Sequence, residues 1–104
     1  MIRQDIDING YWILIVVYDV YLGKENTGFT YTDFNKRKSI VGISESSSQE
    51  QFLNTIVHEA KHVQSHICKY YNVEEDSEEA AYLIGFIIQN MHRTFKNFIS
   101  TGVV

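Results

Sequence analysis

The chain has 104 residues, of which 44% are hydrophobic and 21% charged, and its formal net charge is −4. These values are typical of a globular protein and leave room for one modest core, so we expect a single domain over residues 1–104. The only basic cluster, residues 36–38, is a short run at a predicted turn, which gives little support to nucleic-acid binding. The single cysteine excludes an intrachain disulfide.

The N-terminal segment lacks the sequence features that we expect of a membrane anchor or a secretion signal. The aliphatic run 13–17 is too short to span a bilayer. It is preceded by Asp5 and Asp7 rather than by basic residues, so we expect no signal peptide. Together with the lone cysteine, which suits a reducing compartment, this favours a cytoplasmic protein.

Three β-strands are predicted in the first half of the chain. Residues 11–22 are apolar and rich in β-branched side chains, which is typical of a strand buried on both faces or nearly so. Residues 27–34 alternate loosely, and residues 38–44 form a third apolar run. Turns are expected at 23–26 and 33–36. The pattern predicts a three-stranded, mainly antiparallel sheet.

A long helix is predicted from about residue 48 to residue 71. Ser48 and Gln51 resemble a capping box, and Glu50 suits a helix N-terminus. The apolar residues that follow recur at spacings of three and four, as one buried stripe requires. They are Phe52, Ile56, Val57, Ala60, Val63 and Ile67.

The middle of this helix contains the motif H-E-x-x-H, formed by His58, Glu59 and His62. Two histidines four positions apart lie on one helical face, so both imidazoles can reach a single Zn²⁺ at about 2.0–2.1 Å. Glu59 then stands beside the metal, where it can take a proton from an attacking water. The alternative is a helix with two solvent-facing histidines and an ordinary glutamate.

A catalytic zinc site needs a third protein ligand. His66 is a poor candidate, because eight residues of helix place its Cα about 12 Å along the axis from that of His58. Ser65 and Cys68 stand where metzincins have a glycine and a histidine, so that pattern is absent. Cys68 is better interpreted as a small buried hydrophobic residue.

A second helix, predicted from Ser77 to about Ile99, offers the alternative. Ser77 or Asp76 can cap it, and its first turn contains Glu78 and Glu79. Either glutamate can be the third ligand, or both can simply complement the helix dipole.

These motifs resemble the gluzincin branch of the zincin metallopeptidases. Glu78 begins a Glu-x-x-Ala sequence, and Gly85 follows it by seven residues, as in thermolysin-like enzymes. The chain also resembles small H-E-x-x-H proteins of bacteria and their phages, over roughly residues 38 to 90. The resemblance implies zinc held by His58, His62 and Glu78, with Glu79 as the alternative ligand and Glu59 as the general base.

The resemblance further implies a minimal zincin-like α+β fold, with the sheet packed on the H-E-x-x-H helix and a C-terminal helix. In zincins the sheet edge beside the site binds an extended peptide, which here suggests Ile40 to Ser44. An ordinary strand with no ligand role is the other interpretation of that segment. Tyr82 departs from thermolysin-like enzymes, which have an aspartate there; it can support the site or simply pack between the helices.

The leading hypothesis is therefore a small zinc-dependent metallopeptidase that acts on a peptide or protein substrate. The alternative is a degenerate zincin that binds or regulates a partner protein without hydrolysis. A third possibility is a module in which the His/Glu pattern is accidental. The substrate and the oligomeric state are left open by the sequence.

Overall fold

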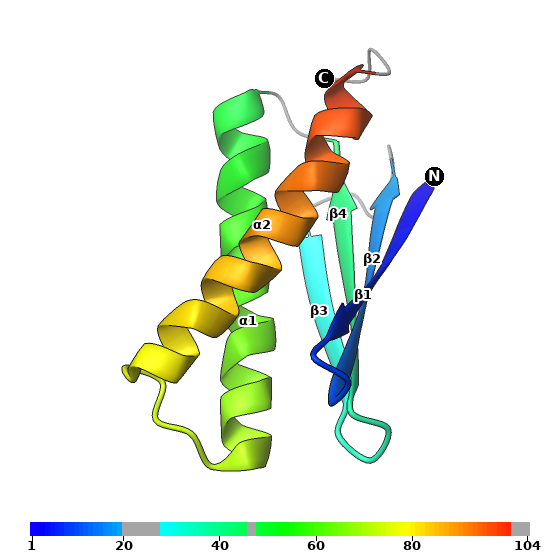
Figure 1. Cartoon of the computed structure of the whole chain (residues 1–104). Coiled ribbons are helices and arrows are strands. Elements are labelled where there is room, and N and C mark those ends of the chain that lie inside the picture. The colour runs from blue at the N-terminus through cyan, green and yellow to red at the C-terminus, as the bar shows by residue number, and fades with distance from the viewer. Residues whose placement is uncertain (20–27, 46–47, 101–104) are drawn as a thin grey trace.

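The computed structural model describes residues 1–19, 28–45 and 48–100, without the side chains of residues 94–100, and shows an α+β protein. Its elements in chain order are β1 (Ile2–Ile8), β2 (Trp12–Asp19), β3 (Gly28–Asp33), β4 (Lys38–Ser44), α1 (Gln49–Tyr71) and α2 (Glu78–Ser100) (Figure 1). The turn expected at 23–26 lies outside the described residues.

The sheet has four strands in the order β1-β2-β4-β3. β2 pairs with β4 in parallel, whereas the β1–β2 and β3–β4 pairs are antiparallel. The expectation of a three-stranded, mainly antiparallel sheet was therefore wrong, because the sheet is four-stranded and mixed. β4 lies between β2 and β3 and is paired on both sides, so the free edges among the described strands belong to β1 and β3.

The missed strand is β1, which carries a clear alternating pattern. Ile6 and Ile8 are buried, whereas Asp5 and Asp7 on the other face are exposed. The turn that follows contains Asn9 and Gly10, both with positive φ (52° and 78°). Asn-Gly between two alternating runs is a strong hairpin signal, because these residues tolerate that backbone conformation.

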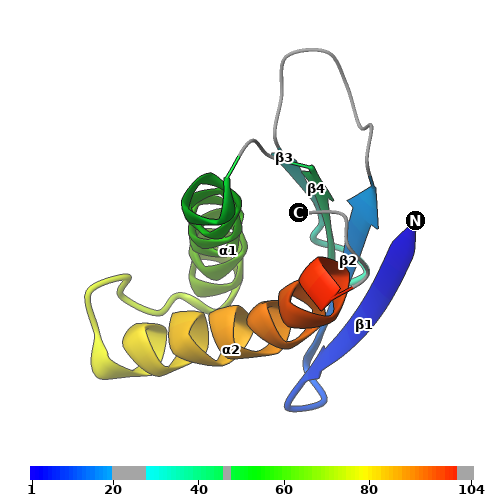
Figure 2. The same cartoon turned by 90° about the horizontal axis from the view of Figure 1, so that it is seen from above.

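Both helices lie on the same face of the sheet, as Figure 2 shows. α1 packs against β3 and β4, and α2 packs against β1 and α1. The shared core includes Trp12, Tyr18 and Phe52. Among the described residues, neither helix is both long and apolar enough to cross a lipid bilayer.

The opposite face of the sheet is not covered by either helix (Figure 2). Along β2, side chains therefore alternate between buried and partly exposed, and Ile13 is 36% exposed. The expectation that this strand is buried on nearly both faces was wrong, because its β-branched residues occupy both faces while the helices cover one.

Both predicted helices are confirmed, and they begin and end within a residue or so of the predicted positions. Ser48 is the N-cap of α1, and its hydroxyl accepts a hydrogen bond from the backbone N–H of Gln51 at 3.1 Å. α1 ends at Asn72, whose left-handed backbone (φ 57°) closes the last turn. Ser77 caps α2 in the same way, accepting from the backbone N–H of Ala80 at 3.2 Å.

α1 lies unusually close to β3 because Gly28 has no side chain. A Cβ at Gly28 would lie 2.9 Å from Cγ2 of Thr55, 3.1 Å from Cγ of Glu59 and 3.0 Å from the carbonyl oxygen of Gly42. One of these neighbours is backbone, so it cannot move aside cheaply. Gly28 therefore sets the distance between β3 and the middle of α1.

Gly28→Ala is expected to lower the free energy of unfolding by about 1–3 kcal/mol, the usual cost of overpacking a filled interface. Gly85→Ala is the matched control, because a Cβ at Gly85 meets nothing within 4 Å and alanine favours a helix interior by about 1 kcal/mol. Urea unfolding of both variants measures the difference. Equal stability of Gly28→Ala and wild type would contradict the close-packing account.

Candidate metal centre

His58 and His62 lie one turn apart on the solvent-exposed side of α1. Their Nε2 atoms are 3.2 Å apart, and their rings meet nearly edge to face, at 77°. In the absence of a metal, one Nε2 can donate its proton to the other across this distance. The pair therefore directs two nitrogen atoms toward one point in space.

The spacing of the two nitrogens fits a shared tetrahedral metal ion. Two ligands at the usual Zn–N distance of about 2.0–2.1 Å are separated by about 3.3 Å along a tetrahedral edge. The observed 3.2 Å between the Nε2 atoms is close to this value. The imidazoles thus fit two of the four positions of a zinc ion without a rotamer change.

Glu59 turns away from solvent, toward β3. Its side chain is 5% exposed, and its Oε1 accepts a hydrogen bond of 2.6 Å from the hydroxyl of Thr30. This bond holds the carboxylate on the side of α1 that adjoins the exposed edge strand. Thr30 was not among the residues predicted from the sequence. The signal was the alternation of β3, in which Gly28, Thr30 and Thr32 lie on one face and the large aromatic residues lie on the other.

The same face of β3 holds His66. The hydroxyl of Thr32 lies 2.7 Å from Nδ1 of His66 and 2.8 Å from the hydroxyl of Ser39, which accepts from the indole N–H of Trp12 at 3.0 Å. Because indole only donates, Ser39 accepts from Trp12, and a donor order that runs from Trp12 through Ser39 and Thr32 to Nδ1 of His66 satisfies all three contacts. This arrangement suits a neutral imidazole that accepts from Thr32. His66 is thus engaged with the sheet, in keeping with the argument against it as a third ligand.

Glu78 and Glu79 both lie in the first turn of α2 and are exposed. Two contacts bring this turn alongside α1: Nε2 of Gln64 donates to the carbonyl of Ala80 at 3.1 Å, and Lys61 pairs with Glu75 at 3.3 Å. Within the described part of the chain, however, no three His, Cys, Asp or Glu side chains are grouped closely enough to hold a metal. Glu78 as third ligand therefore stays a prediction.

The other residues considered from the sequence have clear positions. Cys68 is a free, buried cysteine, as expected, and burial raises the pKa of its thiol. Tyr82 is 75% exposed, so it does not pack between the helices. The segment Ile40 to Ser44 belongs to β4, whose two edges are both paired, so it cannot receive an added peptide strand; that expectation was wrong.

Comparison with protein-family models, curated proteins and solved structures gives no match to this chain.

His66 gives this region a pH dependence. Burial lowers its pKa below the ordinary value of 6.5, with further contributions from His62 and Lys69. Above about pH 6.5 the imidazole is neutral in both folded and unfolded chains. As the pH falls below this value, the unfolded chain takes up the proton first, so stability is lost.

We therefore expect the free energy of unfolding to fall between pH 7.5 and pH 5.5 by more in wild type than in His66→Gln, which keeps an acceptor for Thr32. Urea unfolding at the two pH values measures this, and an NMR titration of His66 gives its pKa directly. A midpoint at or above 6.5 would contradict the burial argument.

Proposed function

We propose that the protein is a zinc-dependent hydrolase of peptide bonds, in which His58 and His62 hold the metal. The observation that supports this most strongly is the 3.2 Å separation of the two Nε2 atoms on an exposed helix face. Zinc bound there would polarise the scissile carbonyl and make water more acidic.

Glu59 is the proposed general base. It follows the first histidine and lies between the metal-binding face of α1 and β3. The hydrogen bond from Thr30 to Oε1 orients the carboxylate and leaves Oε2 as the atom that takes the proton from water and returns it to the leaving amine. A buried position strengthens this interaction because few solvent dipoles compete with it.

The substrate is proposed to be an extended peptide that adds to the free edge of β3. This strand is the edge nearest to α1, and Thr30 connects it directly to Glu59. Backbone N–H and C=O groups at a free edge bind an extended chain without regard to its sequence. Such a peptide would lie along the site, with its scissile bond near His58 and His62.

Glu78 is proposed to complete the metal site. The contacts from Gln64 and Lys61 place the start of α2 beside the turn of α1 that contains His62. Glu78 is the first residue of α2, and ligation would require this first turn to bring its carboxylate to the histidine pair. The free energy of zinc binding is large enough to drive such an adjustment.

A second function, binding a partner protein without hydrolysis, has one observation in its favour: the carboxylate of Glu59 is already hydrogen-bonded to Thr30. A protein of this kind would use the edge of β3 to bind a partner strand and would retain Glu59 for its contact with the sheet.

Purified protein is expected to bind about one zinc ion per chain, and His62→Ala is expected to abolish binding because one of the two convergent nitrogens is lost. His66→Ala is the control, because that ring contacts Thr32. Elemental analysis after zinc-replete expression gives the stoichiometry. A metal-free wild-type protein would refute the proposal.

The third ligand is tested by comparing zinc affinity in Glu78→Gln and Glu79→Gln, which remove the same charge from adjacent positions. Glu78→Gln is expected to weaken zinc binding by about tenfold or more. Losing a residue that binds the metal directly should cost more than losing a hydrogen bond to one of the ligand residues. If only Glu79→Gln loses zinc, the assignment of Glu78 is wrong.

Glu59→Gln is expected to keep the fold and the zinc but to lower the rate of peptide hydrolysis by about 10²–10⁴, the usual contribution of a general base. The amide oxygen of glutamine still accepts from Thr30, so packing is preserved. A library of unstructured peptides, analysed by mass spectrometry, measures cleavage. Equal rates would exclude Glu59 as the base, and a zinc-bound wild type that cleaves nothing would favour the partner-binding function.

A further inference from the structure

A second site lies on the other side of α1 from the histidine pair. The last turns of α1, the first turns of α2 and Tyr11 enclose a cavity of about 300 Å³. It is lined by Tyr11, Ile67, Cys68, Tyr71, Val73, Glu79, Ala80 and Leu83. Ile67 and Cys68 belong to the buried side of α1, so the cavity lies apart from the histidine pair, although Glu79 in its lining is also the alternative third metal ligand.

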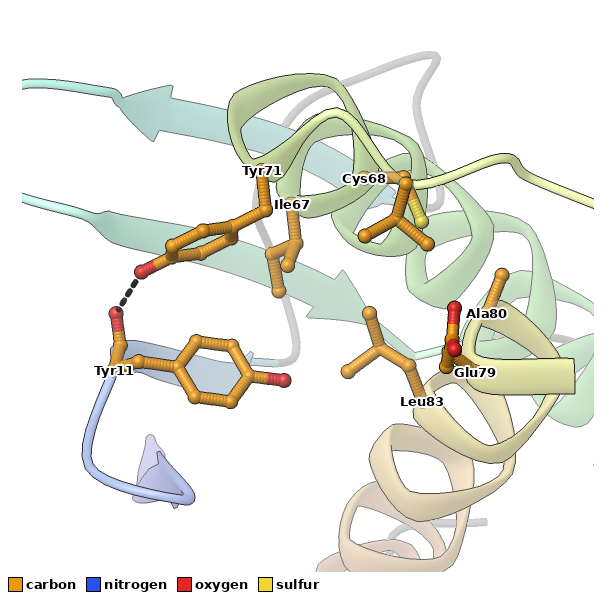
Figure 3. A pocket seen from close by; sticks show the side chains of 8 residues that line it. Tyr11, Ile67, Cys68, Tyr71, Glu79, Ala80 and Leu83 are labelled. Carbon is orange, nitrogen blue, oxygen red and sulfur yellow. Dashed lines mark hydrogen bonds between the residues drawn. The ribbon is translucent and has the colours of Figure 1, made fainter. Parts of the chain in front are cut away.

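The cavity is apolar along its length and aromatic at one end. In the view of Figure 3, Tyr11 and Tyr71 stand at one end, Ile67 and Leu83 in the middle, and Glu79 at the other end near Cys68. The hydroxyl of Tyr71 donates to the carbonyl of Tyr11 at 3.1 Å, and the two rings meet edge to face at 5.3 Å. These contacts fix the aromatic end, so the cavity is largely preformed.

Glu79 is the one charged group in the lining of this cavity. Its carboxylate makes no hydrogen bond or ion pair with any residue that the structure describes, whereas neighbouring Glu75 is paired with Lys61 at 3.3 Å. Further acidic residues lie outside the lining: Glu74 and Asp76 in the connection between the helices, and Glu78 at the start of α2. The surroundings of the cavity are therefore negative, which repels anions and attracts cations.

We propose that this cavity binds a small cationic amphiphile, an amine that carries an aliphatic or aromatic group. The ammonium pairs with the unpartnered carboxylate of Glu79, and the apolar body lies between Ile67 and Leu83. The rings of Tyr11 and Tyr71 accept either an aliphatic chain or an aromatic ring. The volume is at the lower limit of ligand pockets, which restricts the ligand to a small amine of about nine to fifteen heavy atoms.

Two properties of the lining and the charge around it set this choice of ligand. An apolar wall selects a ligand with a hydrocarbon body, because its transfer from water is favourable. A carboxylate with no partner selects a cation, and the acidic connection between the helices excludes fatty acids and phosphates of the same size. A neutral alcohol would fill the space but leave Glu79 without a counter-ion.

The test uses three matched probes, octylamine, octanol and octanoate, below their aggregation concentrations, on the whole chain in buffer with EDTA. NMR titration follows the methyl groups of Ala80 and Leu83 in the cavity and of Ile13 on the open face of the sheet. Octylamine is expected to shift only the cavity methyls and to bind more tightly than octanol, and octanoate is expected not to bind. Because no metal is present, the result does not depend on the proposed hydrolase.

The charge contact is tested with Glu79→Gln and, as the control, Glu78→Gln, which removes the same charge from the adjacent residue outside the lining. Glu79→Gln is expected to weaken octylamine binding about three- to fivefold, to the level of octanol, whereas Glu78→Gln changes it by less than about twofold. The proposal is overturned if octanoate binds as well as octylamine, if the cavity methyls do not shift, or if the two variants weaken binding equally.

Discussion

The close contact between β3 and α1 determines how the rest of this protein presents its polar side chains. Gly28, Thr30 and Thr32 form a row of small residues on one face of β3, and this row lets α1 approach within van der Waals distance. Thr30 then binds the carboxylate of Glu59, and Thr32 contacts the ring of His66. With these two side chains fixed against the sheet, helical geometry places His58 and His62 on the neighbouring, exposed side of α1. One packing contact thus holds Glu59 at the border between the sheet-facing side of α1 and the side that presents the histidine pair.

The two helices are held together by a second set of polar contacts. The side-chain amide of Gln64 is buried and hydrogen-bonded through both polar atoms, because its nitrogen donates to the carbonyl of Ala80 and its oxygen accepts from Lys61 at 2.6 Å. Lys61 also pairs with Glu75, so the start of α2 follows the middle of α1. This arrangement leaves the apolar cavity, which lies between the helix ends, on one side of α1. The histidine pair lies on another side of the same helix. The two proposed sites therefore share a scaffold, and the one residue considered for both is Glu79, which lines the cavity and is the alternative metal ligand.

Local features of the sequence predicted local features of the structure. The periodicity of residues 48–71 and the caps at Ser48 and Ser77 gave both helices, because a helix is made of contacts three and four residues apart. The insertion of β4 between β2 and β3 was not predictable in this way, because strand order depends on pairing between distant segments. β1 was missed although its alternation and the Asn9–Gly10 turn were visible. At the site, the motif identified His58, Glu59 and His62, but Thr30 and Gln64 carry no motif, since their roles exist only when β3 and α2 are in place.

The central claim is that the convergence of His58 and His62 forms two ligands of one zinc ion, completed by Glu78. Zinc K-edge X-ray absorption of the protein loaded with one equivalent of zinc tests this most directly, combined with anomalous diffraction to locate the metal. The account predicts two nitrogen ligands at about 2.0–2.1 Å and a carboxylate oxygen, with the metal between the two Nε2 atoms and near the first turn of α2. A metal bound elsewhere on the chain, or a spectrum of hydrated zinc with no imidazole contribution, would contradict it.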